Sequence, residues 1–195
     1  MITALAMPSY DIISLPDSIG NLVSLTSVHV GHNQLTHLPD SIGNLTSLTH
    51  LYASNNRLTH LPDSIGNLSS LSWLDVYNNQ LTCLPDSIGN LTSLTHLYAS
   101  NNLLTQLPDS IGNLSSLSVL YLGYNQLTAL PDSIHNLTSL SVLGVYFNQL
   151  THLPDSIDNL RLKELYIHNN PITSTLIGRS LVKWRFLRDN MIVRV

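Results

Sequence analysis

The chain has little charge and almost no cysteine. Asp, Glu, Lys and Arg make up 10% of its 195 residues, and Cys83 is its one cysteine. A single cysteine excludes an intramolecular disulfide, which argues against a mature extracellular form. No apolar run approaches the roughly 20 residues of a membrane-spanning helix, so no span is expected. The first residues lack the basic start and long apolar stretch of a signal peptide.

Basic residues are scarce over most of the chain. Up to Asn159 there is one, Arg57, against ten acidic residues, whereas the part from Leu160 onward has seven basic and two acidic residues. The formal net charge of −4 therefore hides an acidic body and a basic tail. An acidic body repels phosphate backbones, so nucleic acid is not an expected partner.

A block of 23 residues recurs along nearly the whole chain. The copies Leu45–Asn67 and Leu91–Asn113 differ at only two positions. A unit this small cannot fold alone, so it must bury its apolar face against copies of itself. The sequence therefore predicts a solenoid with one long, repeated surface.

Half of each unit has the pattern of a short strand. Counted from a first Leu, it reads L-x-x-L/V-x-L/V/A/I-x-x-N-x-L/I, with apolar residues at positions 4 and 6 and outward residues at positions 3, 5 and 7. Position 9 is an asparagine whose amide can satisfy backbone groups buried where the strand turns inward. The asparagines of this row are Asn33, Asn56, Asn79, Asn102, Asn125, Asn148 and Asn170.

The other half reads T-x-L-P-D-S-I-G-N-L. Proline removes a backbone donor, so the chain leaves the sheet there. Too few residues follow for a full helix, and short 3₁₀ turns are expected. We expect the aspartates of the motif, from Asp17 to Asp155, to cap these turns. The Gly-Asn pair suits a turn with unusual φ.

These motifs resemble leucine-rich repeats of the 23-residue class with a Leu-Pro-x-x-Ile back side. That class occurs in Ras-group leucine-rich-repeat proteins and in bacterial repeat proteins, including effectors delivered into host cells. The resemblance implies an α/β repeat fold, a horseshoe solenoid with a concave parallel β-sheet and short 3₁₀ turns on the convex side. We expect this solenoid over residues 1–173, with a degraded first unit at 1–21 and seven strand-bearing repeats from residue 22.

The two ends of the solenoid need protection. Residues 174–195 break the repeat and carry enough apolar side chains to cover the last strand, so a helical C-terminal cap is predicted, with a membrane-surface or partner helix as the alternative. At the other end Tyr10 replaces the asparagine, and the first strand is an open edge. Either Tyr10 and Met7 blunt this edge or the natural protein begins earlier. The chain is expected to be a monomer or to self-associate weakly through this edge.

Aromatic residues concentrate in the outward strand positions. Seven of the eight tyrosines lie there with Trp73 and Phe147, and the back of the repeat has none. Strand propensity alone favours aromatics in strands, but Tyr and Trp also dominate protein interfaces, and we favour a protein-binding face. A central cluster comprises His50, Tyr52, Trp73, Asp75, Tyr77, His96 and Tyr98. A C-terminal cluster comprises Tyr121, Tyr124, Tyr146, Phe147 and Tyr166. Gly144 is expected to leave a gap between Tyr121 and Tyr166 for a partner side chain.

Sites of other kinds are weakly supported. His37, His60 and Cys83 occupy one loop position in successive repeats, but a row spaced at the strand interval does not converge on one metal ion. Cys83 has no base with an orienting carboxylate predicted beside it, so it is not an expected nucleophile. No metal, cofactor or catalytic residue is predicted.

The sequence thus predicts a non-catalytic module that binds a partner protein through its aromatic face. The resemblance favours a bacterial effector that acts on a host protein, cytoplasmic or exported into the host cell. An intracellular signalling scaffold of the Ras-group type is the first alternative. The second is the substrate-recognition part of an enzyme complex such as a ubiquitin ligase.

Overall fold

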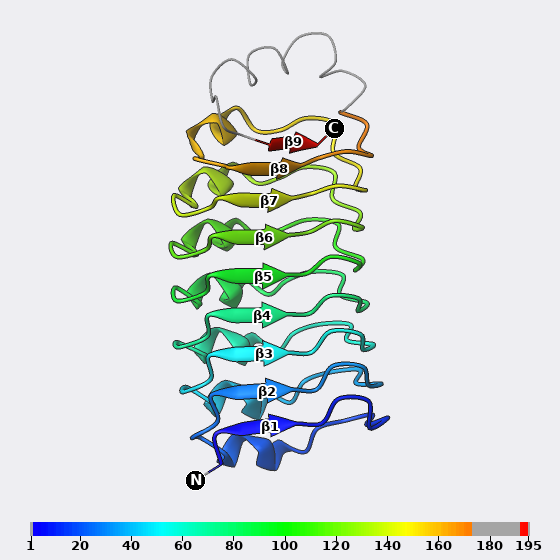
Figure 1. Ribbon diagram of the computed structural model, residues 1–195, viewed down its shortest axis with the longest axis vertical. Helices are drawn as coiled ribbons and strands as arrows, with labels where there is room; N and C mark the ends of the chain where they lie inside the picture. The colour runs from blue at the N-terminus through cyan, green and yellow to red at the C-terminus, as the bar shows by residue number, and fades with distance from the viewer. Residues whose placement is uncertain (1, 173–191, 195) are drawn as a thin grey trace.

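The chain winds into stacked coils, and each coil contributes one strand to a single sheet (Figure 1). The computed structural model describes residues 2–172 and 192–194. The strands follow one another in chain order, and each pairs in parallel with the next. They are β1 (Ala4–Ala6), β2 (Ser27–His29), β3 (His50–Tyr52), β4 (Trp73–Asp75), β5 (His96–Tyr98), β6 (Val119–Tyr121), β7 (Val142–Gly144), β8 (Glu164–Tyr166) and β9 (Ile192–Arg194).

The pairing register follows the sequence repeat. Ala4 pairs with Ser27, Ser27 with His50 and His50 with Trp73, so equal repeat positions lie side by side. The degraded first unit keeps this register, as its apolar spacing predicts. Between β7 and β8 the step shortens by one residue, because the junction before β8 is one residue short.

Short 3₁₀ helices form the opposite side of each coil, as predicted. Each begins directly after the proline of the repeat, which is extended at φ near −68° and ψ near 150° in most coils. They are η1 (Asp17–Asn21), η2 (Asp40–Asn44), η3 (Asp63–Asn67), η4 (Asp86–Asn90), η5 (Asp109–Asn113), η6 (Asp132–Asn136) and η7 (Asp155–Asn159). None of these helices is long and apolar enough to span a membrane, and no other helix is described.

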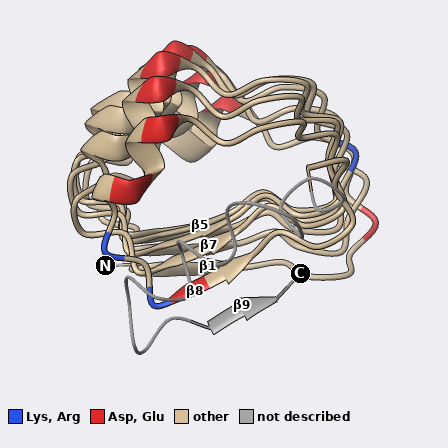
Figure 2. Ribbon diagram, turned by 90° about the horizontal axis from the view of Figure 1, so that it is seen from above, with Lys and Arg blue, Asp and Glu red and all other residues tan. Residues whose placement is uncertain are grey.

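The predicted capping role of the aspartates is wrong. The capping residue of each 3₁₀ helix is the proline, and the aspartate is the first helical residue. No side chain makes a capping hydrogen bond at these termini. Figure 2 shows the acidic residues on the helices across the coil from the sheet, where a carboxylate in the first turn still meets favourable backbone dipoles.

The repeated glycine serves close packing, and the prediction of an unusual φ at this residue is wrong. None of the described glycines has a positive φ. A Cβ on Gly89 would lie 2.5 Å from the backbone oxygen of Ser110 in the next coil. Gly43, Gly66 and Gly112 meet the next serine in the same way. The glycine therefore lets successive 3₁₀ helices approach.

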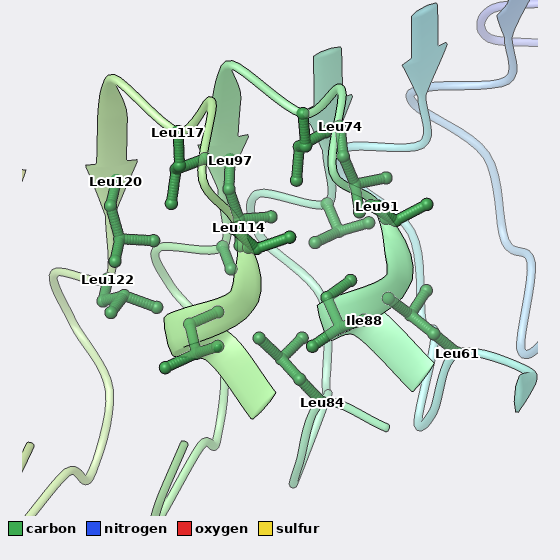
Figure 3. Close-up of a cluster of buried hydrophobic side chains, with 14 of the residues drawn as sticks. Leu61, Leu74, Leu84, Ile88, Leu91, Leu97, Leu114, Leu117, Leu120 and Leu122 are labelled. Atoms are coloured by element: carbon green, nitrogen blue, oxygen red, sulfur yellow. The ribbon is translucent and has the colours of Figure 1, made fainter. Parts of the chain in front are cut away.

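The core is a continuous stack of aliphatic side chains between the sheet and the 3₁₀ helices. Leu74, Leu97 and Leu120 point inward from successive strands and are fully buried. Ile88 and Leu91 from the helical side meet them (Figure 3). Each coil buries its apolar residues against its two neighbours, which is how a short unit becomes stable.

The asparagine row at position 9 satisfies the turn that follows each strand. The Asn79 Nδ2 donates to the carbonyl of Ala53 at 3.0 Å and to that of Val76 at 3.1 Å. Its Oδ1 accepts from the backbone N–H of Leu58 at 2.9 Å. The same pattern repeats at Asn102 and elsewhere in the row. The predicted role of these asparagines, to satisfy backbone groups buried at the turn, is therefore confirmed.

The two ends differ from each other. β1 is the terminal strand of the sheet, Met7 packs partly against the core, and Tyr10 is 69% exposed. At the other end β9 pairs with β8 as a further parallel strand. The predicted helical cap falls mostly on residues 173–191, which lie outside the described residues, and its described part, β9, is a strand.

Candidate functional site on the sheet face

The twelve predicted binding residues all lie on or directly beyond the strands, on the side of the sheet away from the core. We call this surface the sheet face. His50, Trp73 and His96 pair in register at position 3, and Tyr52, Asp75 and Tyr98 pair at position 5. Most of these side chains are half-buried, because each packs against its neighbours in the row. Tyr77, Tyr124 and Phe147 are exposed at 43%, 50% and 40%.

Trp73 lies at the middle of the central cluster. Its ring centroid is 4.4 Å from that of His96, with the planes 19° apart, and 6.4 Å from that of His50. It also meets Tyr98 at 5.0 Å and Tyr52 at 6.2 Å, both tilted. The Trp73 Nε1 is buried and has no hydrogen-bond partner among the described residues. The structure thus brings the central cluster together around one indole.

Threonines directly before the strands hydrogen-bond to the two histidines of the central cluster. The Thr49 hydroxyl donates its one proton to the carbonyl of Thr26 at 2.8 Å, so it accepts from His50 Nδ1 at 2.9 Å. Thr95 holds His96 in the same way. Each imidazole therefore carries a proton on Nδ1. Burial lowers the pKa of His96, which favours its neutral form.

The C-terminal cluster forms two separate ring groups. Tyr121 stacks on Tyr98 at 5.6 Å and meets Tyr166 at 6.2 Å, so it continues the central cluster along position 5. Tyr124 and Phe147 stack at 4.3 Å with planes 9° apart, and the edge of Tyr146 meets Tyr124 at 5.6 Å. We call Tyr124, Tyr146 and Phe147 the rim group, because two of them lie beyond the strand ends at position 8.

The predicted gap at Gly144 is filled. A Cβ on Gly144 would clash with Cδ1 of Tyr121, so the ring of this tyrosine occupies the space over the glycine. The ring of Tyr146 packs over Gly123 in the same way. The space over Gly144 is therefore filled by a ring of the same chain and is not open to a side chain of a partner. Both glycines are buried, which agrees with this packing.

Position 8 has an unusual backbone in every repeat. His32, Asn55, Asn78, Asn101, Tyr124, Phe147 and Asn169 all have φ between 51° and 57°. Asparagine accepts this left-handed conformation readily, and bulky residues do not. Asn78 donates to Oδ1 of Asn55 at 2.8 Å, and Asn101 donates to Oδ1 of Asn78. Tyr124 and Phe147 replace this amide ladder with rings, in spite of the backbone strain.

Three residues of the same rows belong to the clusters although they were not predicted. His29 stacks on Tyr52 at 4.2 Å, and His168 stacks on Tyr146 at 5.1 Å with planes 10° apart. Glu164 accepts a hydrogen bond from the hydroxyl of Tyr166. Their positions in the outward rows were visible in the sequence, but their stacking partners depend on side-chain packing.

Two tyrosines of the sheet face are shifted in acidity. Burial, then the neighbouring Tyr121, Asp75 and Tyr52, raise the pKa of Tyr98. Burial and then Glu164 raise the pKa of Tyr121, although a hydrogen bond with Tyr166 acts in the opposite direction. Both phenols therefore stay neutral hydrogen-bonding groups at physiological pH.

Metal ligands do not gather in the part of the chain that the structure describes. No three His, Cys, Asp or Glu side chains there are placed to hold an ion. Cys83 is free and exposed in its loop. The sheet face is thus a surface of aromatic rings, imidazoles and amides with two carboxylates, and this chemistry suits binding.

Comparisons with known proteins agree with the coil geometry. A family model described as a leucine-rich repeat region matches residues 54–123. A second, described as leucine rich repeat, matches residues 12–58, 100–150 and 115–172. No curated protein relative matches the sequence.

Solved structures of three proteins illustrate the likeness. A leucine-rich-repeat protein of Leptospira interrogans is 33% identical over 87% of this chain and 49% of its own, with a TM-score of 0.69. An internalin of Listeria monocytogenes is 28% identical over 87% of this chain and 48% of its own, with a TM-score of 0.78.

The third is a TDR receptor, 33% identical over 86% of this chain and 30% of its own, with a TM-score of 0.80. The chain thus spans about half of the first two proteins and less of the third. Leucine-rich-repeat domains commonly serve as protein-interaction modules. The two family models together match the chain from residue 12 to residue 172, and the chain belongs to the leucine-rich-repeat family.

Proposed function

We propose that this chain binds a partner protein through the sheet face and carries out no catalysis of its own. The observation that carries this proposal is the one-sided distribution of aromatic rings. The Tyr and Trp rings are in contact with one another from β3 to β8, and the 3₁₀ helices opposite contain no Tyr, Trp or Phe. Large, ordered aromatic side chains give much contact area at a low entropy cost, which is the property of interface hot spots.

The partner that we favour is a host protein, with this chain acting as a bacterial effector, cytoplasmic or exported into the host cell. The likeness to proteins of Leptospira interrogans and Listeria monocytogenes supports a bacterial setting. The nearly identical repeats agree with it, since this pattern resembles that of bacterial effectors. Weak self-association through the open edge of β1 stays a prediction.

A second candidate is the recognition part of a larger assembly, as a signalling scaffold or as the substrate-selecting part of an enzyme complex. The likeness to a TDR receptor favours it, because this chain spans only 30% of that protein. In that protein, coils similar to these are therefore one part of a longer polypeptide.

The test compares captured proteins and their affinities. Wild-type protein and a Trp73→Ala/Tyr98→Ala variant are immobilised and exposed to the same host-cell extract. We expect proteins that bind the wild type to be lost with the variant. For such a partner, Trp73→Ala alone should weaken binding by at least about 2 kcal/mol, or roughly thirtyfold, in a titration.

The matched control changes the opposite side of the same coils. In Asp86→Asn/Asp109→Asn two exposed side chains of η4 and η5 lose their charge without touching the sheet face. This variant should keep every partner. If the Trp73/Tyr98 variant captures the same proteins with the same affinity, binding through the sheet face is ruled out.

A further inference from the structure

Asp75 interrupts a run of aromatic side chains at position 5 of the sheet face. It pairs in register with Tyr52 on one side and with Tyr98 on the other. Strands lie about 4.8 Å apart, so these two tyrosine backbones are separated by roughly 10 Å. Asp75 is much shorter than either ring, and the tyrosines therefore stand higher than the carboxylate between them.

Each of these tyrosines has one ring face already covered. His29 stacks on Tyr52 at 4.2 Å, from the strand before. Tyr121 stacks on Tyr98 at 5.6 Å, from the strand after. Trp73, from the strand of Asp75 itself, meets both rings, so the carboxylate is surrounded by aromatic side chains.

Two further rings flank the carboxylate along its own strand. Trp73 lies two residues before Asp75, and its ring reaches both Tyr52 at 6.2 Å and Tyr98 at 5.0 Å. Tyr77 lies two residues after it and is 43% exposed. Asp75 Oδ1 accepts from the backbone N–H of Tyr77 at 3.0 Å, which fixes the side chain at the base of this arrangement.

The charge of Asp75 is not balanced within the described part of the chain. Its one hydrogen bond comes from a neutral backbone group, and no ion pair to it occurs there. Arg57, the one basic residue up to Asn159, follows the turn after β3 and is exposed. Of the histidines in the central cluster, His96 has a lowered pKa that favours its neutral form. A half-buried carboxylate without a counterion attracts a cation from outside.

We propose that Asp75 and the rings around it, Tyr52, Trp73 and Tyr98, bind an arginine side chain of the partner protein. This proposal rests on the proposed function and adds the chemistry of the group that is recognised. A guanidinium is flat and weakly hydrated, so it packs against exposed ring surfaces better than a strongly hydrated ammonium does. It stacks favourably on aromatic rings and forms two parallel hydrogen bonds with a carboxylate.

The test uses the intact protein with N-acetyl-arginine amide as the probe. The chain has two tryptophans, Trp73 and Trp184. Their indole N–H signals are separated by NMR, with a Trp184→Phe variant for assignment. We expect the Trp73 signal to shift in a saturable way as the probe is added. The neutral isostere N-acetyl-citrulline amide should cause no saturable shift, and the lysine analogue should bind more weakly than arginine.

Variants identify the carboxylate. Asp75→Asn should weaken arginine binding at least about tenfold, whereas Asp75→Glu should keep most of it, because the charge is retained. Asp86→Asn removes one charge from the opposite side of the same coil and should bind as the wild type does. Thermal unfolding of each variant shows that it is folded. Equal affinity of Asp75→Asn and wild type, or equal binding of the citrulline probe, overturns the arginine site.

The arginine site and the proposed function fail in different ways. If the probe does not bind but partners are still lost with Trp73→Ala/Tyr98→Ala, the arginine site is wrong and the sheet face remains the binding surface. If the probe binds as expected but the double variant keeps every partner, the proposed function is wrong and the cation site stands as a property of the surface.

Discussion

Single side chains of this protein hold neighbouring coils together. Asn79 is 8% exposed and makes four hydrogen bonds, two to the coil before and two within its own coil. Buried backbone groups that lose their partner cost about 1–3 kcal/mol each, since they have already left water. The row of such asparagines therefore contributes to stability at every coil.

Asn79→Ala is expected to lower the free energy of unfolding by about 3 kcal/mol or more, because it leaves several buried backbone groups unpaired at once. Urea unfolding followed by circular dichroism measures this loss. The control is Gln80→Ala, which changes the adjacent exposed side chain and should cost less than about 0.5 kcal/mol. A loss below about 1 kcal/mol for Asn79→Ala would contradict this role.

In the rim group, by contrast, two residues have a backbone conformation that we expect to lower stability. Tyr124 and Phe147 occupy left-handed positions where three other repeats place an asparagine ladder. We expect Tyr124→Asn/Phe147→Asn to raise the free energy of unfolding by about 1 kcal/mol, since relief of strain at two positions outweighs the loss of ring contacts between side chains that are largely exposed.

Urea unfolding of that double variant and titration with a partner separate the two effects. Stability should rise while affinity for the partner falls. The reverse change, Asn78→Phe, breaks the amide ladder at an equivalent position and should lower stability. A double variant that is clearly less stable than the wild type would show that the left-handed rings are not strained.

At the scale of the element, the 3₁₀ helices stack through a glycine in one helix and a serine in the next. Gly89 in η4 lies against Ser110 in η5, and the contact recurs along the back of the solenoid. The sixth and last pair, η6 and η7, departs from the pattern, since η6 has His135 where η1 to η5 have glycine. The shortened junction follows η7, so the regular repeat ends there.

Gly89→Ala is expected to destabilise the protein by about 1–3 kcal/mol, because the new Cβ would overlap the backbone of Ser110 and push the helices apart. This is opposite in sign to the usual effect of replacing an unstrained glycine. Thermal unfolding measures it, and Asn90→Ala, an exposed change in the same helix, is the control. An increase in melting temperature for Gly89→Ala would refute the close contact.

At the scale of the whole molecule, the protein is a one-dimensional stack. Each strand pairs only with the strands before and after it in sequence. Each 3₁₀ helix likewise contacts the next one along the chain. Stability is then close to a sum over coils and over the interfaces between them.

Removal of one whole coil should therefore leave a shorter folded protein. Deletion of Leu91–Asn113 joins Asn90 to Leu114 and preserves every repeat position. We expect cooperative urea unfolding with a lower midpoint and a slope reduced by roughly an eighth, since one coil less is exposed. Deletion of Leu94–Leu104 removes a strand and keeps its helix, so that protein should not fold cooperatively. If both deletions behave alike, the coils are not independent units.

The sequence by itself determined the repeat, the strand positions, the role of the asparagines at position 9 and the outward rows, down to the residues of the sheet face. It could do so because a repeat of fixed length gives each position one environment, and the apolar pattern states which positions are buried.

Only the tertiary structure decided the contacts between coils. It assigned the repeated glycine to helix stacking, placed Tyr121 over Gly144, put the left-handed backbone at Tyr124 and Phe147, and paired β9 with β8. The same holds for the rings around Asp75. Each of these depends on the side chain or backbone that lies opposite in the neighbouring coil, and the pattern within one repeat carries no information about that neighbour's packing.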